Sequence, residues 1–149
     1  MKRLITIIPV LIIAAIFSVT LFSFIEGTAT AAEQENIDQS RLLVVWTSGD
    51  REVALKMVFM YTYNAKLRGW WDEVQLLVWG PSSKLLSSDK ELQEHIERMK
   101  ETGIILTACK ACADQYDVSD TLSGLGIDVK YMGEPLTDML KEGWTTITF

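Results

Sequence analysis

GIILTACKACA, residues Gly103–Ala113, joins a short apolar run to the only two cysteines of the chain, Cys109 and Cys112. The run over residues 104–108 is continuous, which is typical of a buried strand. A thiol that follows a parallel strand, where the next helix begins, lies where α/β folds place ligands and reactive groups. Free backbone N–H groups and the positive end of a helix favour the thiolate there. The stretch therefore predicts a functional thiol site.

Outward from this stretch, apolar runs alternate with segments of helical spacing. The apolar runs predict buried parallel strands, over residues 42–46, 74–79, 104–108 and 127–131, with 144–149 as a last edge strand. Spacing and capping residues predict helices over 51–67, after a Ser88–Glu91 capping box, over 109–116, and from Pro135 to Gly143. Residues 80–83 read as a loop. Strands joined by crossover helices predict an α/β fold of three layers, a mostly parallel sheet flanked by helices.

The first 31 residues have the features of an export signal. Lys2 and Arg3 precede an apolar stretch over residues 4–25, and residues 29–31 fit a cleavage site before Ala32. The stretch is also long enough to span a bilayer, so an uncleaved anchor is the alternative. Residues 32–40 are expected to be a flexible leader and residues 41–149 one domain. Either way, we expect this domain in the periplasm or another extracytoplasmic compartment, with membrane contact only if the segment stays uncleaved.

The charge of the chain argues against one class of partner. The formal net charge is −6, and it becomes −7 without residues 1–31, which carry Lys2, Arg3 and Glu26. An acidic domain without a basic run is a poor candidate for binding nucleic acid. We therefore expect no nucleic-acid partner.

The cysteine segment resembles one known family. Cys109, the strand before it and KACADQYDV after it (Lys110–Val118) look like the DsrE/DsrF-like family of sulfur-relay proteins. The resemblance extends over residues 41–149 and includes the motifs WGP at 79–81 and GIDV at 126–129. It implies a flavodoxin-like, DsrE-like layered fold and a homo-oligomer, often a trimer or hexamer. It also implies that Cys109 carries sulfur as a persulfide, received from a donor protein and passed to an acceptor protein.

The second cysteine leaves several chemistries open. Cys112, one helical turn away, could attack a persulfide on Cys109 and release sulfide, which makes it a resolving thiol. The alternatives are a structural Cys109–Cys112 disulfide in a non-catalytic oligomeric binding module, a dithiol redox protein, or a Cu(I) site. So short a disulfide loop would restrain the unfolded chain little. Structural zinc normally takes four ligands and the chain adds only His95, so we expect neither a resident metal nor a cofactor.

Residues near the ends of the first two predicted strands could surround the thiols. Trp46 and Trp79 end adjacent strands and, together with Ser48, Gly80 and Pro81, are predicted to line a pocket at Cys109. Burial of the two tryptophans in the core is the alternative interpretation.

Two further tryptophans stand where a loop should be polar. Trp70 and Trp71 lie between a predicted helix and a predicted strand. Large apolar side chains in such a place indicate a covered surface, and we interpret it as a subunit interface.

Overall fold

The structure is a computed structural model, and it describes residues 40–149. The predicted export signal, its cleavage site and the predicted leader up to residue 39 lie outside the described residues. Within the described part of the chain, no helix is both long enough and apolar enough to cross a membrane.

Five parallel strands form one sheet in the described part of the chain, in the order β4-β3-β2-β1-β5. Their bounds are β1 Arg41–Trp46, β2 Glu73–Val78, β3 Ile105–Cys109, β4 Asp128–Lys130 and β5 Thr145–Thr148. β1 and β2 are buried from their second residue onward, which explains why their sequences are continuously apolar. Each predicted strand is present, and the predicted edge strand is β5.

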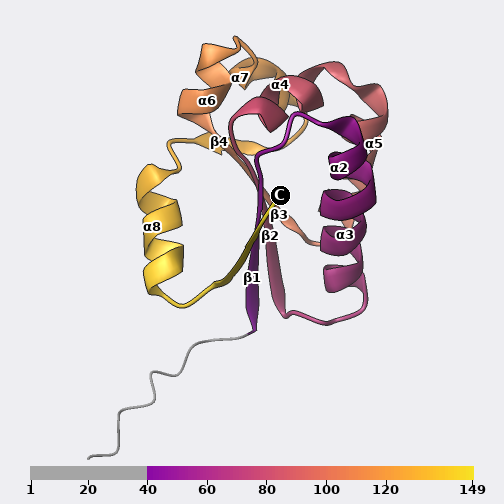
Figure 1. The fold of residues 1–149 in the computed structure, drawn as a ribbon, viewed down its shortest axis with the longest axis vertical. Helices are drawn as coiled ribbons and strands as arrows, with labels where there is room; N and C mark the ends of the chain where they lie inside the picture. The colour runs from indigo at the N-terminus through magenta and orange to yellow at the C-terminus, as the bar shows by residue number, and fades with distance from the viewer. Residues whose placement is uncertain (1–39) are drawn as a thin grey trace, which may run out of the picture. The chain divides into compact units, whose positions relative to one another are not determined.

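Helices cover both faces of the sheet, but unequally. Their bounds are α2 Arg51–Val53, η2 Ala54–Phe59, α3 Met60–Leu67, α4 Pro81–Ser88, α5 Lys90–Glu101, α6 Lys110–Gln115, α7 Ser119–Gly124 and α8 Gly133–Lys141. α2, α3 and α5 lie on one side of the sheet, and α8 lies on the other (Figure 1). Strands β1 to β4 are added in one direction, whereas the chain from β4 returns past β1 to β5. Right-handed crossovers therefore put α8 on the opposite face. The predicted three-layer α/β class is confirmed.

Each face has its own hydrophobic core. The larger cluster lies on the side of η2 and α5, and it contains the fully buried Trp46, Phe59 and Leu76. The Trp46 ring meets Phe59 edge-on, with the ring centroids 5.0 Å apart. The smaller cluster lies on the side of α8, and its buried members are Leu43, Val45, Leu77, Cys109, Met132 and Trp144. α8 packs against this cluster without burying any residue completely.

Residues 80–83 begin a helix, although the sequence suggested a loop. Gly80 is the N-cap of α4, with φ 72° and ψ −133°, and Pro81 occupies the first turn. Proline suits that position because first-turn N–H groups have no partner within the helix. The backbone of Gly80 lies in a region that residues with a Cβ atom rarely adopt. The end of β2 therefore turns sharply into α4 at Gly80.

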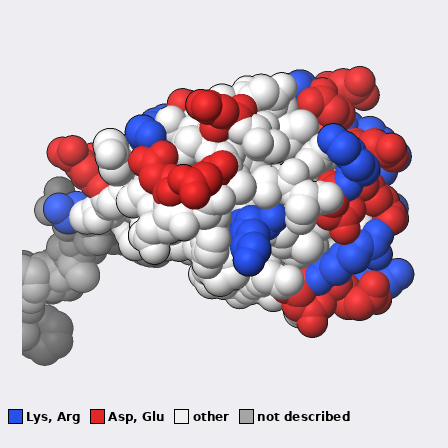
Figure 2. Space-filling view, turned by 90° about the horizontal axis from the view of Figure 1, so that it is seen from above, with Lys and Arg blue, Asp and Glu red and all other residues white. Residues whose placement is uncertain are grey.

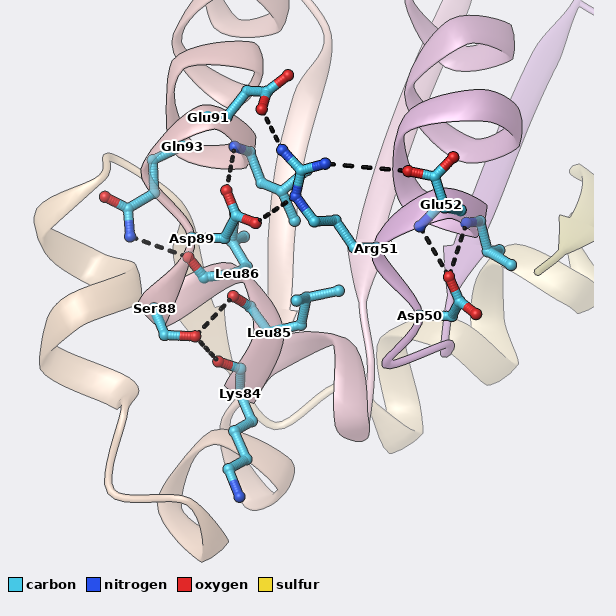
Figure 3. Close-up of polar contacts among 12 residues, drawn as sticks. Asp50, Arg51, Glu52, Lys84, Leu85, Leu86, Ser88, Asp89, Glu91 and Gln93 are labelled. Atoms are coloured by element: carbon cyan, nitrogen blue, oxygen red, sulfur yellow. Dashed lines mark hydrogen bonds and ion pairs between the residues drawn. The ribbon is translucent and has the colours of Figure 1, made fainter.

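The predicted Ser88–Glu91 capping box is wrong, because Asp89 caps α5. The Asp89 carboxylate accepts a hydrogen bond of 3.1 Å from the backbone N–H of Leu92 and pairs with the Arg51 guanidinium at 2.8 Å. Arg51 also pairs with Glu91, so the start of α2 is tied to the start of α5 (Figure 3). The bond from Leu92 is the largest of the effects that lower the pKa of Asp89. Ser88 instead bonds back to carbonyls of the preceding turn of α4.

Several predicted elements differ from the structure in detail. The helix over 51–67 is continuous, but its middle part, Ala54–Phe59, is π-helical. α8 begins at Gly133 instead of Pro135, and Gly143 follows its end with φ 81°. β3 ends at Cys109, one residue later than expected, so this cysteine still belongs to the sheet.

Candidate functional site

The two cysteines meet at the carboxyl edge of the sheet. Cys109 is the last residue of β3 and also the N-cap of α6, while Cys112 lies within the first turns of α6. Neither cysteine forms a disulfide. A hydrogen bond joins their side chains. β3 lies beside β2 in the sheet, so the thiol pair stands next to the segment that leads from β2 into α4.

The two thiols differ in exposure. Cys109 is 4% exposed and belongs to the smaller core cluster, with Leu77 and Met132 among its neighbours in that cluster. Cys112 is half-buried and packs against the outside of the same cluster, as Trp79 does. Cys112 is therefore the thiol that solvent reaches more easily.

The surroundings of Cys112 shift the pKa of its thiol in opposite directions. Burial is the largest effect and raises the pKa of the Cys112 thiol, and its hydrogen bond with Cys109 raises that pKa further. The backbone N–H of Gly80 donates to the Cys112 sulfur and works against this rise, because it stabilises the thiolate. The net effect is a pKa above the ordinary value, so Cys112 is mainly a thiol at neutral pH.

Lys110 does not supply the thiols with an uncompensated positive charge. Its ammonium nitrogen bonds both carboxylate oxygens of Asp114, at 2.8 and 2.9 Å, one helical turn further along α6. This pairing raises the pKa of Lys110 and lowers that of Asp114. The same nitrogen lies 6.0 Å from the centroid of the Tyr131 ring. The lysine charge is thus balanced by a carboxylate at the surface.

A serine that sequence reasoning left out holds the segment beside the thiols. The buried hydroxyl of Ser82 lies 2.6 Å from the carbonyl oxygen of Trp46 and accepts a bond of 3.1 Å from the backbone N–H of Trp79. It thus ties the end of β1 to the start of α4 and fixes the turn that presents the Gly80 N–H to Cys112. A Gly-Pro pair followed by serine after a strand is typical of a helix start. This pattern could have pointed to Ser82 in the sequence.

The structure brings together some of the predicted pocket residues but not all. Gly80 lies beside Cys112, and Trp79 packs against the same cluster as Cys112 does. Trp46 is fully buried in the larger core, on the opposite face of the sheet from Cys109. Of the remaining two, Ser48 lies in the segment after β1, where its hydroxyl accepts from the Asp50 N–H at 3.0 Å, and Pro81 is exposed at the start of α4.

His95 lies away from the thiols, over the larger core. Its ring is tilted against Phe59, with centroids 5.7 Å apart, at a hollow of about 300 Å³ that Met60, Tyr63 and Arg98 also line. Burial lowers the pKa of His95, and the Arg98 charge lowers it further. Among residues 40–149, no group of three or more His, Cys, Asp and Glu side chains is placed to hold a metal ion.

Trp70 is one of the most exposed large apolar side chains of the described residues. It is 56% exposed and stands beside Tyr61, with ring centroids 6.2 Å apart, and beside the Arg68 guanidinium. Met60 and Asn64 complete a shallow hollow of about 310 Å³ around it. Trp71 is half-buried against the larger core.

Charge is spread unevenly over the end of the molecule at which the strands finish. Figure 2 looks onto this end, where α4, α6 and α7 lie, and shows uncharged surface in the middle of the view with one basic group within it. Acidic and basic side chains gather mainly toward the side of α2 and α5.

The parallel sheet with helices on both faces makes this a three-layer α/β protein. The structure superposes on the ychN protein from E. coli with a TM-score of 0.60 and 13% sequence identity, over 74% of this chain and all of that one. At this identity the similarity shows the fold alone. The resemblance noted from the sequence is therefore supported at the level of the DsrE-like fold.

A second solved structure shows the family. A conserved protein of unknown function from Bacteroides thetaiotaomicron, BT1422, is 36% identical, with a TM-score of 0.72, over 74% of this chain and 95% of that one. This chain belongs to the same family as that protein. No profile of a known protein family and no curated protein matches the sequence.

Proposed function

We propose that this protein handles reduced sulfur as a persulfide or polysulfide carrier, with Cys109 and Cys112 as its working residues. The observation that carries the proposal is the thiol pair itself: two free cysteines in mutual contact at the carboxyl edge of a parallel sheet. That edge is where open α/β sheets place their ligands. The DsrE-like fold, a fold used by sulfur-relay proteins, supports the proposal as an analogy.

The chemistry needs only the two thiols and a sulfur donor. A cysteine thiolate attacks the terminal sulfur of a hydropolysulfide anion, which leaves a cysteine persulfide and a hydropolysulfide that is one sulfur shorter. The second thiolate can then attack the cysteine sulfur of the persulfide. This forms the Cys109–Cys112 disulfide and expels HS⁻, so charge and sulfur balance. The sequence assigns the persulfide to Cys109 and the resolving step to Cys112.

Contact between the thiols also favours a second candidate function. Two free cysteines this close can close a disulfide without large movement, as in dithiol redox proteins or in a binding module with a structural bridge. A Cu(I) site needs two thiolates as soft ligands, and the same pair offers them. These candidates predict no stable addition of sulfur to either cysteine.

Intact mass of the reduced protein after exposure to polysulfide separates these functions. A carrier gains mass in steps of one sulfur atom, or releases sulfide and loses two hydrogens as the disulfide closes. A protein that is always isolated with the disulfide closed, and that gains no sulfur after reduction, would be a structural or redox protein.

We further propose that the protein is exported and assembles with copies of itself. N-terminal sequencing from the native host should give a mature chain that begins near Ala32, and a topology-reporter fusion should place the domain outside the cytoplasm. An uncleaved chain would make the protein a membrane-anchored one, and a cytoplasmic reporter signal would reject export. Sulfur donor and acceptor proteins are the expected further partners.

A further inference from the structure

The two thiols of the proposed carrier site are unequally accessible. Cys109 is 4% exposed and is enclosed by the apolar cluster beneath α8. Cys112 stands on the outer side of that cluster, half-buried, between Cys109 and the start of α4. A sulfur donor must approach the attacking thiolate in line with the bond that breaks. Of the two thiols, Cys112 leaves more room for such an approach.

The room for a product differs as well. A persulfide on Cys109 would add a sulfur atom to a packed cluster that includes Leu77, Met132 and Trp144. Extra volume in a well-packed core forces side chains out of their preferred rotamers and is destabilising. A persulfide on Cys112 can extend toward solvent instead. Packing therefore disfavours storage of sulfur at Cys109 and permits it at Cys112.

We propose that Cys112 is the first acceptor of sulfur, that Cys109 is the resolving thiol behind it, and that the substrate is a small inorganic polysulfide anion. This order is the reverse of the one that the sequence predicts, and the inference rests on the proposed function. A polysulfide is a thin chain that a half-buried thiol can receive, whereas a protein-bound persulfide needs a wider opening. In this scheme the polysulfide therefore takes the place of the sulfur donor protein, and the acceptor protein remains.

The steps balance without any further reactant. The Cys112 thiolate attacks HSₙ⁻, which gives the Cys112 persulfide anion and HSₙ₋₁⁻. Cys109, already in contact with Cys112, loses its proton to solvent and attacks the Cys112 sulfur of the protonated persulfide. The disulfide forms and HS⁻ leaves. If an acceptor thiolate attacks the outer sulfur first, the sulfur is transferred and Cys112 returns to the thiolate.

Gly80 is a positioning residue in this scheme. Its backbone N–H donates to the Cys112 sulfur and stabilises the thiolate. Because the pKa of Cys112 is still raised, we expect the loading rate to keep climbing with pH into the alkaline range. A merely structural cysteine would show no such profile.

Matched alanine variants of the two cysteines test the order of attack. Reduced wild type, Cys112→Ala and Cys109→Ala are exposed to inorganic polysulfide, and sulfur is located by peptide mass. We expect the Cys112→Ala loading rate to fall at least about tenfold, since the remaining thiol is shielded. Cys109→Ala should load on Cys112 and keep the persulfide, because nothing resolves it. Far-UV circular dichroism confirms that each variant is folded, and Cys109→Ser serves as a second variant at the buried position.

Each contrary outcome removes a different part of the proposal. Loading of Cys112→Ala at the wild-type rate, with Cys109→Ala inert, would reverse the order but leave the carrier function standing. Equal loading by glutathione persulfide and by inorganic polysulfide would overturn the substrate class alone. If wild type gains no sulfur and releases no sulfide, the proposed function itself fails, and this inference fails with it.

Discussion

Among residues 40–149, one face of the sheet lies under α2, α3 and α5, whereas the other lies under α8 (Figure 1). The first face holds the larger core, with Trp46 and Phe59 fully buried. The second face holds the smaller cluster, and its covering helix buries no residue completely. Cys109 belongs to that second, thinner layer. The comparison suggests that the thick layer supplies most of the stability, while the thin layer is where a small ligand can reach a buried thiol.

Two adjacent leucines in β2 give the strongest test of this comparison. Leu76 points into the larger core and Leu77 into the smaller one, and both are fully buried. Leu→Ala changes in cores cost about 2–5 kcal/mol, and the cost is lower where the surroundings can collapse into the cavity. We expect Leu76→Ala to lie near the upper end and Leu77→Ala near the lower end of that range, as measured by urea unfolding. Equal losses of free energy would mean that the two layers are equally rigid.

The next largest effect is expected at Gly80, at the edge of the thin layer. With φ 72° and ψ −133° and no atom within 4 Å of an added Cβ, the obstacle to alanine is the backbone conformation and not space. Gly80→Ala should cost about 1–3 kcal/mol of unfolding free energy. It should also change the rate at which iodoacetamide alkylates Cys112, because the Gly80 N–H meets that sulfur.

Gly124 provides the matched control for this substitution. It ends α7 without a positive φ, and an added Cβ would meet nothing within 4 Å. Gly124→Ala should therefore leave stability unchanged or raise it by up to about 1 kcal/mol. If Gly80→Ala behaves in the same way and Cys112 alkylates as in wild type, Gly80 has no special part in the site.

A smaller effect is expected at the helix caps on the thick side. Asp89→Ala removes the cap of α5 and should cost about 1 kcal/mol, whereas Ser88→Ala should cost much less. The lowered pKa of Asp89 means that its stabilisation is complete above the ordinary carboxyl pKa of 3.8 and is lost as the pH falls through the folded-state value. The difference in unfolding free energy between wild type and Asp89→Ala, measured by urea unfolding, should therefore disappear in acid. A difference in unfolding free energy that persists at low pH would show that the ionised carboxylate of Asp89 does not cause it.

The sequence predicted the layers because strand and helix periods differ, but it could not place side chains on faces. Continuous apolar runs identify β1 and β2 as doubly covered, yet such a run looks the same from either face. The register decides the face: Val45 pairs with Leu77, and Leu77 pairs with Thr107, two residues before Cys109. Trp46 follows Val45 and so points the other way, into the larger core. To place Trp46 relative to the thiols, one must know how the strands pair, and the sequence of a single strand does not show this.

Local competition explains the other differences. Ser88 and Asp89 both suit a helix cap, and the charged Asp89 gains a partner, Arg51, that is remote in sequence. The position of the thiol pair at a strand end followed from the strand pattern alone. The burial of Cys109 could not be predicted in this way. It depends on α8, which follows β4 in the chain and crosses the sheet on the way to β5. Contacts between distant segments are what the pattern could not supply.

The smallest effect on the single chain, and the sharpest on assembly, is expected at Trp70. Because Trp70 is 56% exposed, Trp70→Ala should change the unfolding free energy of one subunit by only about 0.5 kcal/mol or less. If the exposed surface around Trp70 is the subunit interface, the same change should dissociate a trimer or hexamer in light scattering.

Leu140 on α8 is 52% exposed and provides the matched variant on the thin side. Dissociation by Leu140→Ala but not by Trp70→Ala would move the interface to the face that carries Cys109, and copies of the chain would then shield the thiols themselves. A monomer at micromolar concentration, unchanged by either variant, would leave both surfaces open to solvent and reject self-assembly.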